Sequence, residues 1–321
     1  MSVAAVPAPS ESPNLESVAC YYCGGLACSP FETAQDDLTG RPGNFTFVTC
    51  NGCGLVYQNP RIELQEIKTY YDDEYIAHRK KADWGILTRF FDATMDRLDK
   101  KKDVISRRYV SLTRDSEVLD VGCGAATFLT KLQTLYGAKV AGVDFMDLSH
   151  LPGFEKIDFR CGLFYEADLE SDRFDLVTMW HFLEHDYDPL RSLNNARRVM
   201  KIDGVLVVEV PRLDCLSYRL YRERWPGLQA PQHTVLYSRE TLERFVARAG
   251  LEVVDYLPYG AYPAYFYLFA GAAFKILRGR GLNLSKAIYP YFLGQLLLAP
   301  LLLFEKRLNL AMQTIVCRRR S

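Results

Sequence analysis

Two short cysteine pairs are the first residues whose type and spacing indicate chemistry. Cys20 and Cys23 form one CxxC turn, Cys50 and Cys53 form a second, and a glycine follows each turn. Four thiolates in two such turns can enclose one Zn²⁺, and each glycine permits the positive φ that turns backbone amides toward sulfur. A redox-active CxxC would need only one pair, so the duplicate favours a structural zinc site that stabilises a small module. Cys28 lies outside this scheme and is expected to bind no metal.

A glycine-rich segment farther along the chain predicts a ligand-binding loop. An apolar strand carries Asp120 near its end and is followed by Gly122, Cys123 and Gly124 before a helix begins. Glycines in such a turn let a ligand approach the backbone, and the amides at the start of the helix face it. Asp144 ends the next expected strand, about 20 residues further on, where a carboxylate can accept both hydroxyls of a ribose.

Two classes of ligand fit this arrangement of glycines and carboxylates. Nicotinamide dinucleotides and S-adenosylmethionine both contain a ribose that Asp144 could bind. Asp120 stands directly before the glycines, where it would repel a pyrophosphate but attract a cationic sulfonium and its amino group. The pattern therefore favours S-adenosylmethionine.

A second group of polar residues follows the fourth expected strand of the body, where an open α/β sheet presents its ligand crevice. There His181, Glu184 and His185 match the HxxEH spelling of an inverted zinc-protease motif. That motif requires a helix, whereas this segment leaves a strand and soon meets Pro189, so a protease is disfavoured. His233 lies in the loop after the fifth strand, where it could take a proton from an attacking hydroxyl or could be a hydrogen-bonding surface residue.

The elements that must position these residues alternate between short apolar strands and amphipathic helices. Two further helices with apolar residues at helical spacing precede them, over 64–75 and 86–109. Short apolar runs separated by such helices are typical of a parallel, doubly wound α/β sheet. The expected strands are 118–121, 139–143, 157–161, 174–179, 205–210, 251–257 and 313–317, and the helices between them are 128–135, 189–200 and 239–249.

Several segments carry a resemblance to a known family. They are VLDVGCG at the glycine loop, GVD at Asp144, FDLVTMWHFLEH across the fourth strand, the turn from Lys201 to Gly204, and PQHTVLYSRETL downstream. Over about residues 17–256 the chain resembles class I S-adenosylmethionine-dependent methyltransferases, in the branch with an N-terminal cysteine module and a core similar to ubiquinone-pathway O-methyltransferases. The resemblance implies a Rossmann-like methyltransferase sheet preceded by a small zinc ribbon and followed by an apolar helical hairpin.

The resemblance also implies roles for individual residues on the cofactor side. Two departures from the family pattern lie near the loop. Ala126 replaces the third glycine, and the Leu-Pro-Gly sequence at 151–153 shortens the helix expected after Asp144, which leaves the adenine side more open. The implied cofactor contacts are Asp120, Gly122, Cys123 and Gly124 around the methionine part, Asp144 at the ribose, Phe145 on the adenine face and Asp168 at the adenine amine.

On the acceptor side, the resemblance makes His181 and His233 the candidate catalytic residues. His181 would face the acceptor, His185 would be structural, and the loop that carries His233 would close over the acceptor. In quinone-pathway relatives an acidic and a histidine position can hold a divalent ion. Glu184 and His185 match that pattern but His181 replaces a further acid, so a catalytic metal is disfavoured.

Two apolar runs near the C-terminus, 261–274 and 287–304, contain no charged residue. The second has 18 residues, near the lower limit of about 17 for spanning a bilayer. Its prolines and the four cations between the runs oppose a crossing, so we expect a peripheral, monotopic membrane contact through 261–304. A soluble helical lid or a dimer face is the alternative, and apolar helices beside the site would suit a lipid or lipid-linked acceptor.

Composition excludes other classes of function. The chain has 321 residues with 39 Lys or Arg and 39 Asp or Glu, and Arg41 is the only cation between the CxxC pairs. It therefore lacks the basic bias of a dedicated nucleic-acid binder, and no nucleic-acid partner is expected. The chain has nine cysteines, and this odd number indicates free thiols and a metal site rather than a set of disulfides. We therefore expect the protein in the reducing cytoplasm. If the apolar runs contact a membrane, it would lie at the inner face of that membrane.

These observations combine into one functional hypothesis. The chain is expected to move a methyl group from S-adenosylmethionine to a nucleophile, with oxygen favoured, of a small-molecule, glycan or lipid-linked acceptor. The alternatives are a non-catalytic scaffold that binds the cofactor and a nucleic-acid-modifying enzyme that grips its substrate with the ribbon. The expected division is a flexible tail at 1–17, a zinc ribbon at 18–60, a helical cap at 61–114, the cofactor-binding core at 115–260, an apolar hairpin at 261–310, and a final strand with a basic tail at 311–321.

Overall fold

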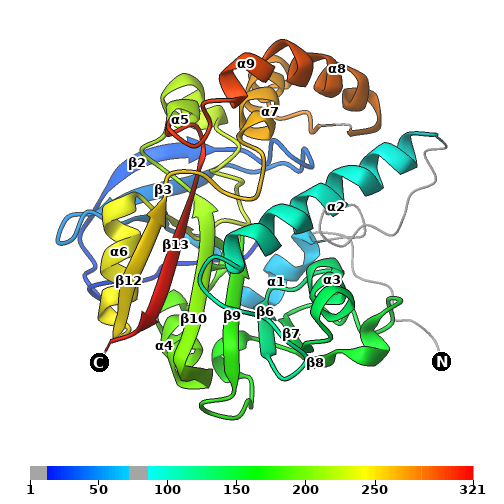
Figure 1. Cartoon of the computed structure of the whole chain (residues 1–321). Coiled ribbons are helices and arrows are strands. Elements are labelled where there is room, and N and C mark those ends of the chain that lie inside the picture. Colours follow the sequence, from blue (N-terminus) through cyan, green and yellow to red (C-terminus); the bar gives the residue numbers. More distant parts are fainter. Residues whose placement is uncertain (1–12, 72–85, 283, 321) are drawn as a thin grey trace, which may run out of the picture.

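A seven-stranded sheet forms the centre of the computed structural model, which describes residues 13–71, 86–282 and 284–320. Figure 1 shows the strands, which lie in the order β8-β7-β6-β9-β10-β13-β12. The strands from β8 to β10 run parallel, and β13 is antiparallel to both of its neighbours. The predicted doubly wound α/β sheet is confirmed. Its strands are β6 Glu117–Val121, β7 Lys139–Asp144, β8 Asp158–Cys161, β9 Phe174–Trp180, β10 Met200–Pro211, β12 Leu251–Leu257 and β13 Met312–Arg319.

Helices cover both faces of this sheet because its central strands are apolar on both sides. Along β6, Val118 packs into the hydrophobic cluster on one face and Leu119 into the cluster on the other. The first face carries α2 Ile86–Ser106 and α3 Thr127–Tyr136, and the second carries α4 Pro189–Val199 and α6 Arg239–Arg248.

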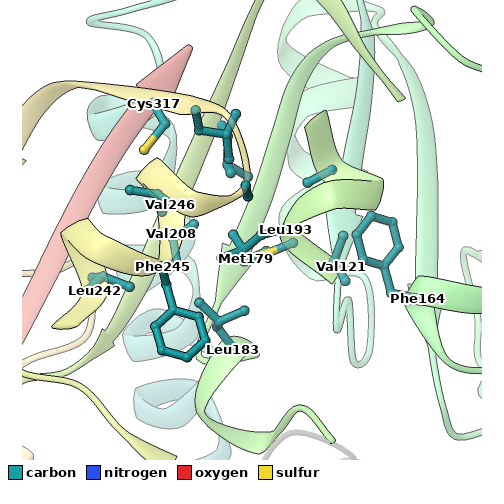
Figure 2. Packing of buried hydrophobic residues seen from close by; sticks show 14 of the residues in the cluster. Val121, Phe164, Met179, Leu183, Leu193, Val208, Leu242, Phe245, Val246 and Cys317 are labelled. Atoms are coloured by element: carbon teal, nitrogen blue, oxygen red, sulfur yellow. The ribbon is translucent and has the colours of Figure 1, made fainter. Parts of the chain in front are cut away.

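The packing on the second face is shown in Figure 2. Leu193 of α4 and Phe245 of α6 lie near Met179 of β9 and Val208 of β10, within one buried cluster. All four side chains are at most 1% exposed. Burial of such side chains contributes about 1.5–3 kcal/mol each to folding.

Two of these helices begin with local signals that the sequence contains. The side chain of Asp188 accepts a hydrogen bond from the backbone N–H of Arg191 at 3.1 Å, and Pro189 takes the first position of α4. Ser238 and Thr241 cap α6 reciprocally, each side chain accepting from the other residue's backbone N–H. These caps satisfy backbone donors that a helix start leaves free.

The N-terminal module is a ribbon that is continuous with the core. Three antiparallel strands, β2 Cys28–Ala34, β3 Phe45–Cys50 and β4 Val56–Gln58, are completed by β11 Val235–Leu236, which belongs to the core part of the chain. The ribbon strands therefore share a sheet with a strand that begins two residues after His233.

Part of the predicted N-terminal tail is ordered. β1 Leu15–Glu16 pairs antiparallel with β5 Arg61–Ile62, so residues 15–16 join the structure where a flexible segment was expected. The helix predicted over 64–75 is present as α1 Leu64–Ile67 followed by a 3₁₀ turn at Lys68–Tyr70, and its remainder beyond residue 71 lies outside the described residues.

A helical insertion, residues 258–311, connects β12 to β13. It contains α7 Ala264–Leu277, α8 Leu284–Leu297 and α9 Ala299–Leu302, and a short helix of the core, α5 Leu216–Tyr221, packs against α7. Figure 1 shows these helices gathered at one end of the sheet, with α2 running beside them. Among the described residues, no helix has the length and apolarity that a membrane crossing requires.

Candidate active site and metal centre

The four cysteines of the two CxxC turns lie together. The Sγ atoms of Cys20 and Cys53 are 3.4 Å apart, as are those of Cys23 and Cys50, and all four lie within 4.8 Å of one another. Cys28 is not part of this group. A tetrahedron with Zn–S bonds of about 2.3 Å has sulfur–sulfur edges of about 3.8 Å, so the four donors fit one Zn²⁺.

Each cysteine turn has the backbone geometry that the sequence predicts. The N–H of Gly24 donates to the carbonyl of Cys20 at 2.8 Å, and that of Gly54 donates to Cys50 at 2.9 Å. Both glycines have left-handed φ values, 73° and 76°. Burial raises the pKa of the Cys20 thiol, and a bound cation would offset that cost because it holds its ligands as thiolates.

The cysteine site also contacts the core. The Arg244 side chain of α6 donates to the carbonyl of Cys53 at 2.9 Å, and its guanidinium lies 4.6 Å from the ring of Tyr22. Cys20 and Cys50 belong to the same hydrophobic cluster as the second face of the sheet. Loss of the metal would therefore disturb the core as well as the ribbon.

The predicted cofactor loop is bent over the end of the sheet and held by Asp144. Gly122 and Gly124 have φ values of 73° and 50°. The N–H of Gly122 donates to the carbonyl of Val143 at 2.8 Å, and the N–H of Gly124 donates to Oδ2 of Asp144 at 3.0 Å. Ala126 keeps the left-handed turn with a φ of 54°, so the alanine that departs from the family pattern does not straighten the loop.

Five of the seven predicted cofactor residues line one cavity. Cys123 turns its Sγ toward Gly142, where an added Cβ would lie 2.8 Å from it, and Phe145 meets the ring of Tyr71 edge-on. The lining residues from the predicted set are Gly122, Cys123, Gly124, Asp144 and Phe145.

The other two predicted cofactor residues lie away from the cavity wall. Asp120 is buried beneath the loop, accepts a hydrogen bond from the hydroxyl of Thr178 at 2.6 Å, and has its pKa raised to about 6 by burial. Asp168 is exposed and is not among the lining residues, so the structure does not bring it to the loop. The cavity wall near the end of β8 is formed instead by Gly162, Leu163 and Phe164.

The cavity has a volume of about 1900 Å³, larger than the roughly 300–1,000 Å³ of a pocket for one drug-sized ligand. It extends from the glycine loop to the helical insertion and is bordered by α2. It can therefore accept two molecules side by side. The far end is aromatic, with Tyr262, Tyr265, Phe266, Phe269, Tyr291 and Phe292 among its lining residues.

His181 lines the cavity between two carboxylates. Its Nε2 lies 3.2 Å from Oε1 of Glu209, and its Nδ1 lies 3.4 Å from Oε1 of Glu184. Although burial opposes the charge, the two carboxylates raise the pKa of His181 to about 9. The imidazole is therefore protonated at neutral pH, with both N–H groups directed at acids.

Glu209 was not identified from the sequence. Its carboxylate is 1% exposed and accepts from the backbone N–H groups of Ala261 at 2.7 Å and Tyr262 at 2.9 Å. Despite burial, the bond to protonated His181 lowers the pKa of Glu209, so it stays ionised. A single acid inside the apolar run 205–210 was the available signal, because a charge in a buried strand requires partners.

His233 has a different electrostatic state. It is buried, and its Nδ1 lies 2.8 Å from the carbonyl of Gly227, which can only accept, so Nδ1 carries the proton and Nε2 keeps its lone pair. Burial and the neighbouring His185, whose ring centroid is 4.4 Å away, lower the pKa of His233 well below its usual value. His233 is thus a neutral histidine that lines the cavity.

Glu184, His185 and His233 each offer one ligand atom, and these atoms lie within 4.8 Å of one another. Nδ1 of His185 lies 2.8 Å from the hydroxyl of Tyr71. Nitrogen and carboxylate donors suit a divalent cation, but protonated His181 already balances the charge of Glu184. A cation here would compete with that imidazolium.

Replacing Cys20 by serine should remove the bound metal. We expect elemental analysis to find about one zinc per purified wild-type chain, and much less in the variant, together with a lower free energy of unfolding. Cys28→Ser is the matched control because this cysteine lies outside the cluster. Full zinc content in the Cys20 variant would exclude a site of four thiolates.

The charged state of His181 gives stability a defined pH dependence. Its pKa is about 9 in the folded chain and about 6.5 in an unfolded one. Its contribution to the free energy of unfolding is therefore complete below pH 6.5 and is lost as the pH rises through 9. We expect urea unfolding to show wild type more stable than His181→Gln by about 1–3 kcal/mol at pH 6, with the difference shrinking by pH 10. The exposed His150→Gln serves as control, and a difference that is constant with pH would mean that His181 is neutral.

Comparison with known sequences assigns a family. Residues 86–256, more than half of the chain, match the family described as "Methyltransferase domain". A ubiquinone biosynthesis O-methyltransferase of Rhodopseudomonas palustris is 34% identical over 155 residues, which cover 43% of this chain and 59% of that protein. The corresponding protein of Hahella chejuensis is 29% identical over 151 residues, covering 44% and 58%. The match thus spans about three fifths of the length of these relatives.

Solved structures agree on the fold. The 1,6-didemethyltoxoflavin-N1-methyltransferase of Burkholderia thailandensis superposes with a TM-score of 0.50 at 12% identity, covering 91% of this chain and all of that one. A Haemonchus contortus protein named Phospholethanolamine N-methyltransferase 2 gives 0.51 at 13% identity, covering 83% and 63%. The chain belongs to the methyltransferase domain family and has the fold of the class I S-adenosylmethionine-dependent enzymes.

Proposed function

We propose that this protein transfers a methyl group from S-adenosylmethionine to an oxygen of a small acceptor that carries an apolar portion, a lipid or lipid-linked molecule included. One observation carries the proposal: a single cavity joins the glycine loop, His233 and the aromatic wall of the helical insertion. Bound S-adenosylmethionine would supply an electrophilic methyl group on a cationic sulfonium. The rest of the reaction depends on how the chain holds and deprotonates the acceptor.

Asp144 supports the cofactor end of the proposal. Its carboxylate lies at the tip of β7 and lines the cavity while it accepts from the backbone N–H groups of Gly124 and Met146, both at 3.0 Å. A carboxylate held in this way is oriented before the ligand arrives and can accept the two ribose hydroxyls. Asp120, below the loop, would add negative charge near a sulfonium without contacting it.

His233 is the better candidate for the base. A general base needs a free lone pair within reach of the acceptor proton, and Nε2 of neutral His233 has one. His181 does not, because its pKa is about 9 and both of its nitrogens face carboxylates. Of the two histidines predicted to be catalytic, we therefore assign proton transfer to His233 and positioning of Glu184 and Glu209 to His181.

The low pKa of His233 limits the kind of acceptor hydroxyl from which it can take a proton. A weak base removes a proton more readily from an acidic hydroxyl, such as a phenol with a pKa near 10, than from an aliphatic alcohol. An aliphatic alcohol is a much weaker acid and would need a stronger base or a metal ion. A phenolic or enolic hydroxyl therefore suits this site, with the apolar portion of the acceptor among aromatic residues such as Tyr262 and Phe266.

Replacing Asp144 by alanine should weaken the binding of S-adenosylmethionine and S-adenosylhomocysteine by roughly 100-fold or more, because two charge-assisted hydrogen bonds are lost. Isothermal titration calorimetry checks this, with NADH as a ligand that should not bind. Asp168→Ala is the matched control, and we expect it to bind like wild type because Asp168 lies outside the cavity. Wild-type affinity in the Asp144 variant would remove the ribose assignment, and weakened binding in the Asp168 variant would restore its predicted adenine contact.

Replacing His233 by glutamine should lower kcat by about 10²–10⁴, with unchanged affinity for S-adenosylmethionine. The assay follows release of S-adenosylhomocysteine with phenols that carry alkyl chains of increasing length. We expect kcat/KM to rise with chain length because the far end of the cavity is apolar. Cofactor binding without transfer to any oxygen acceptor would identify a non-catalytic binder, and a wild-type kcat in the variant would exclude His233 as the base.

A further inference from the structure

We propose that the outer surface of α8, α9 and the segment up to residue 308 docks on a lipid bilayer that contains anionic head groups, and that the acceptor enters the cavity from this side. Docking of this surface on lipid does not depend on the proposed function. Entry of the acceptor from this surface rests on the proposed function.

The surface is apolar and exposed. Along α8, Leu293 and Leu297 are spaced by one helical turn and are 61% and 71% exposed. The opposite side of α8 packs on α7, where the hydroxyl of Tyr265 donates to the carbonyl of Tyr291 at 2.7 Å. Other exposed apolar residues of the same surface are Leu296, Leu298, Leu303, Phe304 and Leu308.

The same surface forms the rim of the cavity. Leu296 and Leu303 are 73% and 83% exposed, yet both also line the cavity that reaches the glycine loop. An acceptor with an apolar chain that entered past these leucines would keep that chain out of water along the whole route. The route passes Tyr291 and Phe292 on the inner side of α8.

The charge around this surface favours anionic lipid. Residues 261–310 contain six Lys or Arg and one acid, Glu305, whereas the rest of the chain contains 33 Lys or Arg and 38 Asp or Glu. Glu305 accepts from the backbone N–H of Ala264 at 3.1 Å, whereas Arg278, Arg280 and Arg307 have exposed side chains. Clusters of cations beside an apolar surface bind anionic head groups.

Other occupants fit less well. Two copies joined through this surface would bring two positively charged regions together, which opposes association. A transmembrane arrangement does not agree with the helices, since none of those in the described part of the chain could cross a bilayer and Pro290 lies inside α8. An interfacial position satisfies both the apolar and the charged residues.

The test is flotation of the full-length chain with vesicles of phosphatidylcholine alone or with added phosphatidylglycerol. We expect the wild type to float with the anionic vesicles and the double variant Leu293→Asp, Leu297→Asp to bind them at least tenfold more weakly. These leucines lie on the surface but do not line the cavity, so the variant should retain its affinity for S-adenosylhomocysteine. The matched control is Leu26→Asp with Ile202→Asp, at 80% and 75% exposure outside the insertion, and it should float like wild type.

Two further experiments test the role of the arginines in lipid binding and the entry of the acceptor into the cavity. Arg278→Glu with Arg307→Glu should lower flotation with anionic vesicles and leave any binding to phosphatidylcholine alone unchanged. In turnover assays, the leucine variant should lose activity toward a long-chain phenol embedded in vesicles and keep it toward a short-chain phenol in solution.

Three results would overturn the proposal that this surface docks on lipid. The first is a wild type that does not float, and the second is a leucine variant that floats as well as wild type. The third is a concentration-dependent dimer that the leucine substitutions dissociate, with no flotation of either protein. Calorimetry with S-adenosylhomocysteine on the same preparations keeps the two proposals distinguishable. Flotation without cofactor binding would support the docking surface and reject the proposed function. Cofactor binding without flotation would reject the docking surface and leave the proposed function standing.

Discussion

A single carboxylate at the end of β10 holds the acceptor side of the cavity together. Glu209 receives hydrogen bonds from His181 at the end of β9, from the backbone of Ala261 and Tyr262 where the helical insertion begins, and from the hydroxyl of Thr314 on β13. A buried charge is costly unless such donors surround it, so these segments can meet only in an arrangement that satisfies Glu209. The approach is close, because a Cβ on Gly260 would lie 2.5 Å from the carboxylate. Hydrogen bonds to Glu209 therefore help to position the start of the insertion.

The ribbon is coupled to the same region by a different interaction. β4 pairs with β11, and the backbone N–H of Gln58 donates to the carbonyl of Thr234, the residue after His233, at 2.8 Å. The sheet that begins at the four cysteines thus ends at the loop that carries the proposed base. A metal ion held by the four cysteines would therefore act on the proposed reaction through the structure alone. The ion would order the ribbon, and the ribbon would fix the backbone beside His233.

The proximity of the glycine loop to Asp144 could be predicted from the sequence because the geometry is local. Gly122, Gly124 and Asp144 lie on consecutive elements of one βαβ unit, so chain order almost determines their proximity. The acceptor side could not, because the state of His181 depends on Glu209, which is 28 residues away in sequence and reaches it only when β9 and β10 pair. Asp168, expected at the adenine amine from the family resemblance, is exposed and lies outside the cavity wall, which residues 162–164 form near the end of β8. A shift of a few residues within a loop cannot be determined from spacing alone.

The two histidines beside the cavity show why residue type alone does not define a catalytic role. His181 and His233 have the same unperturbed pKa, yet two carboxylates hold the first as a cation, while burial beside His185 holds the second neutral. A cation in a fixed pair with two acids adds no free base to the cavity, and a neutral imidazole with one nitrogen on a carbonyl leaves the other nitrogen for a proton. The two protonation states also place charge at different points of the cavity. The ion pairs of His181 hold the carboxylates of Glu209 and Glu184, and aromatic residues of the helical insertion such as Tyr262 and Phe266 line the cavity beyond them, which suits an acceptor with an acidic hydroxyl and an apolar chain.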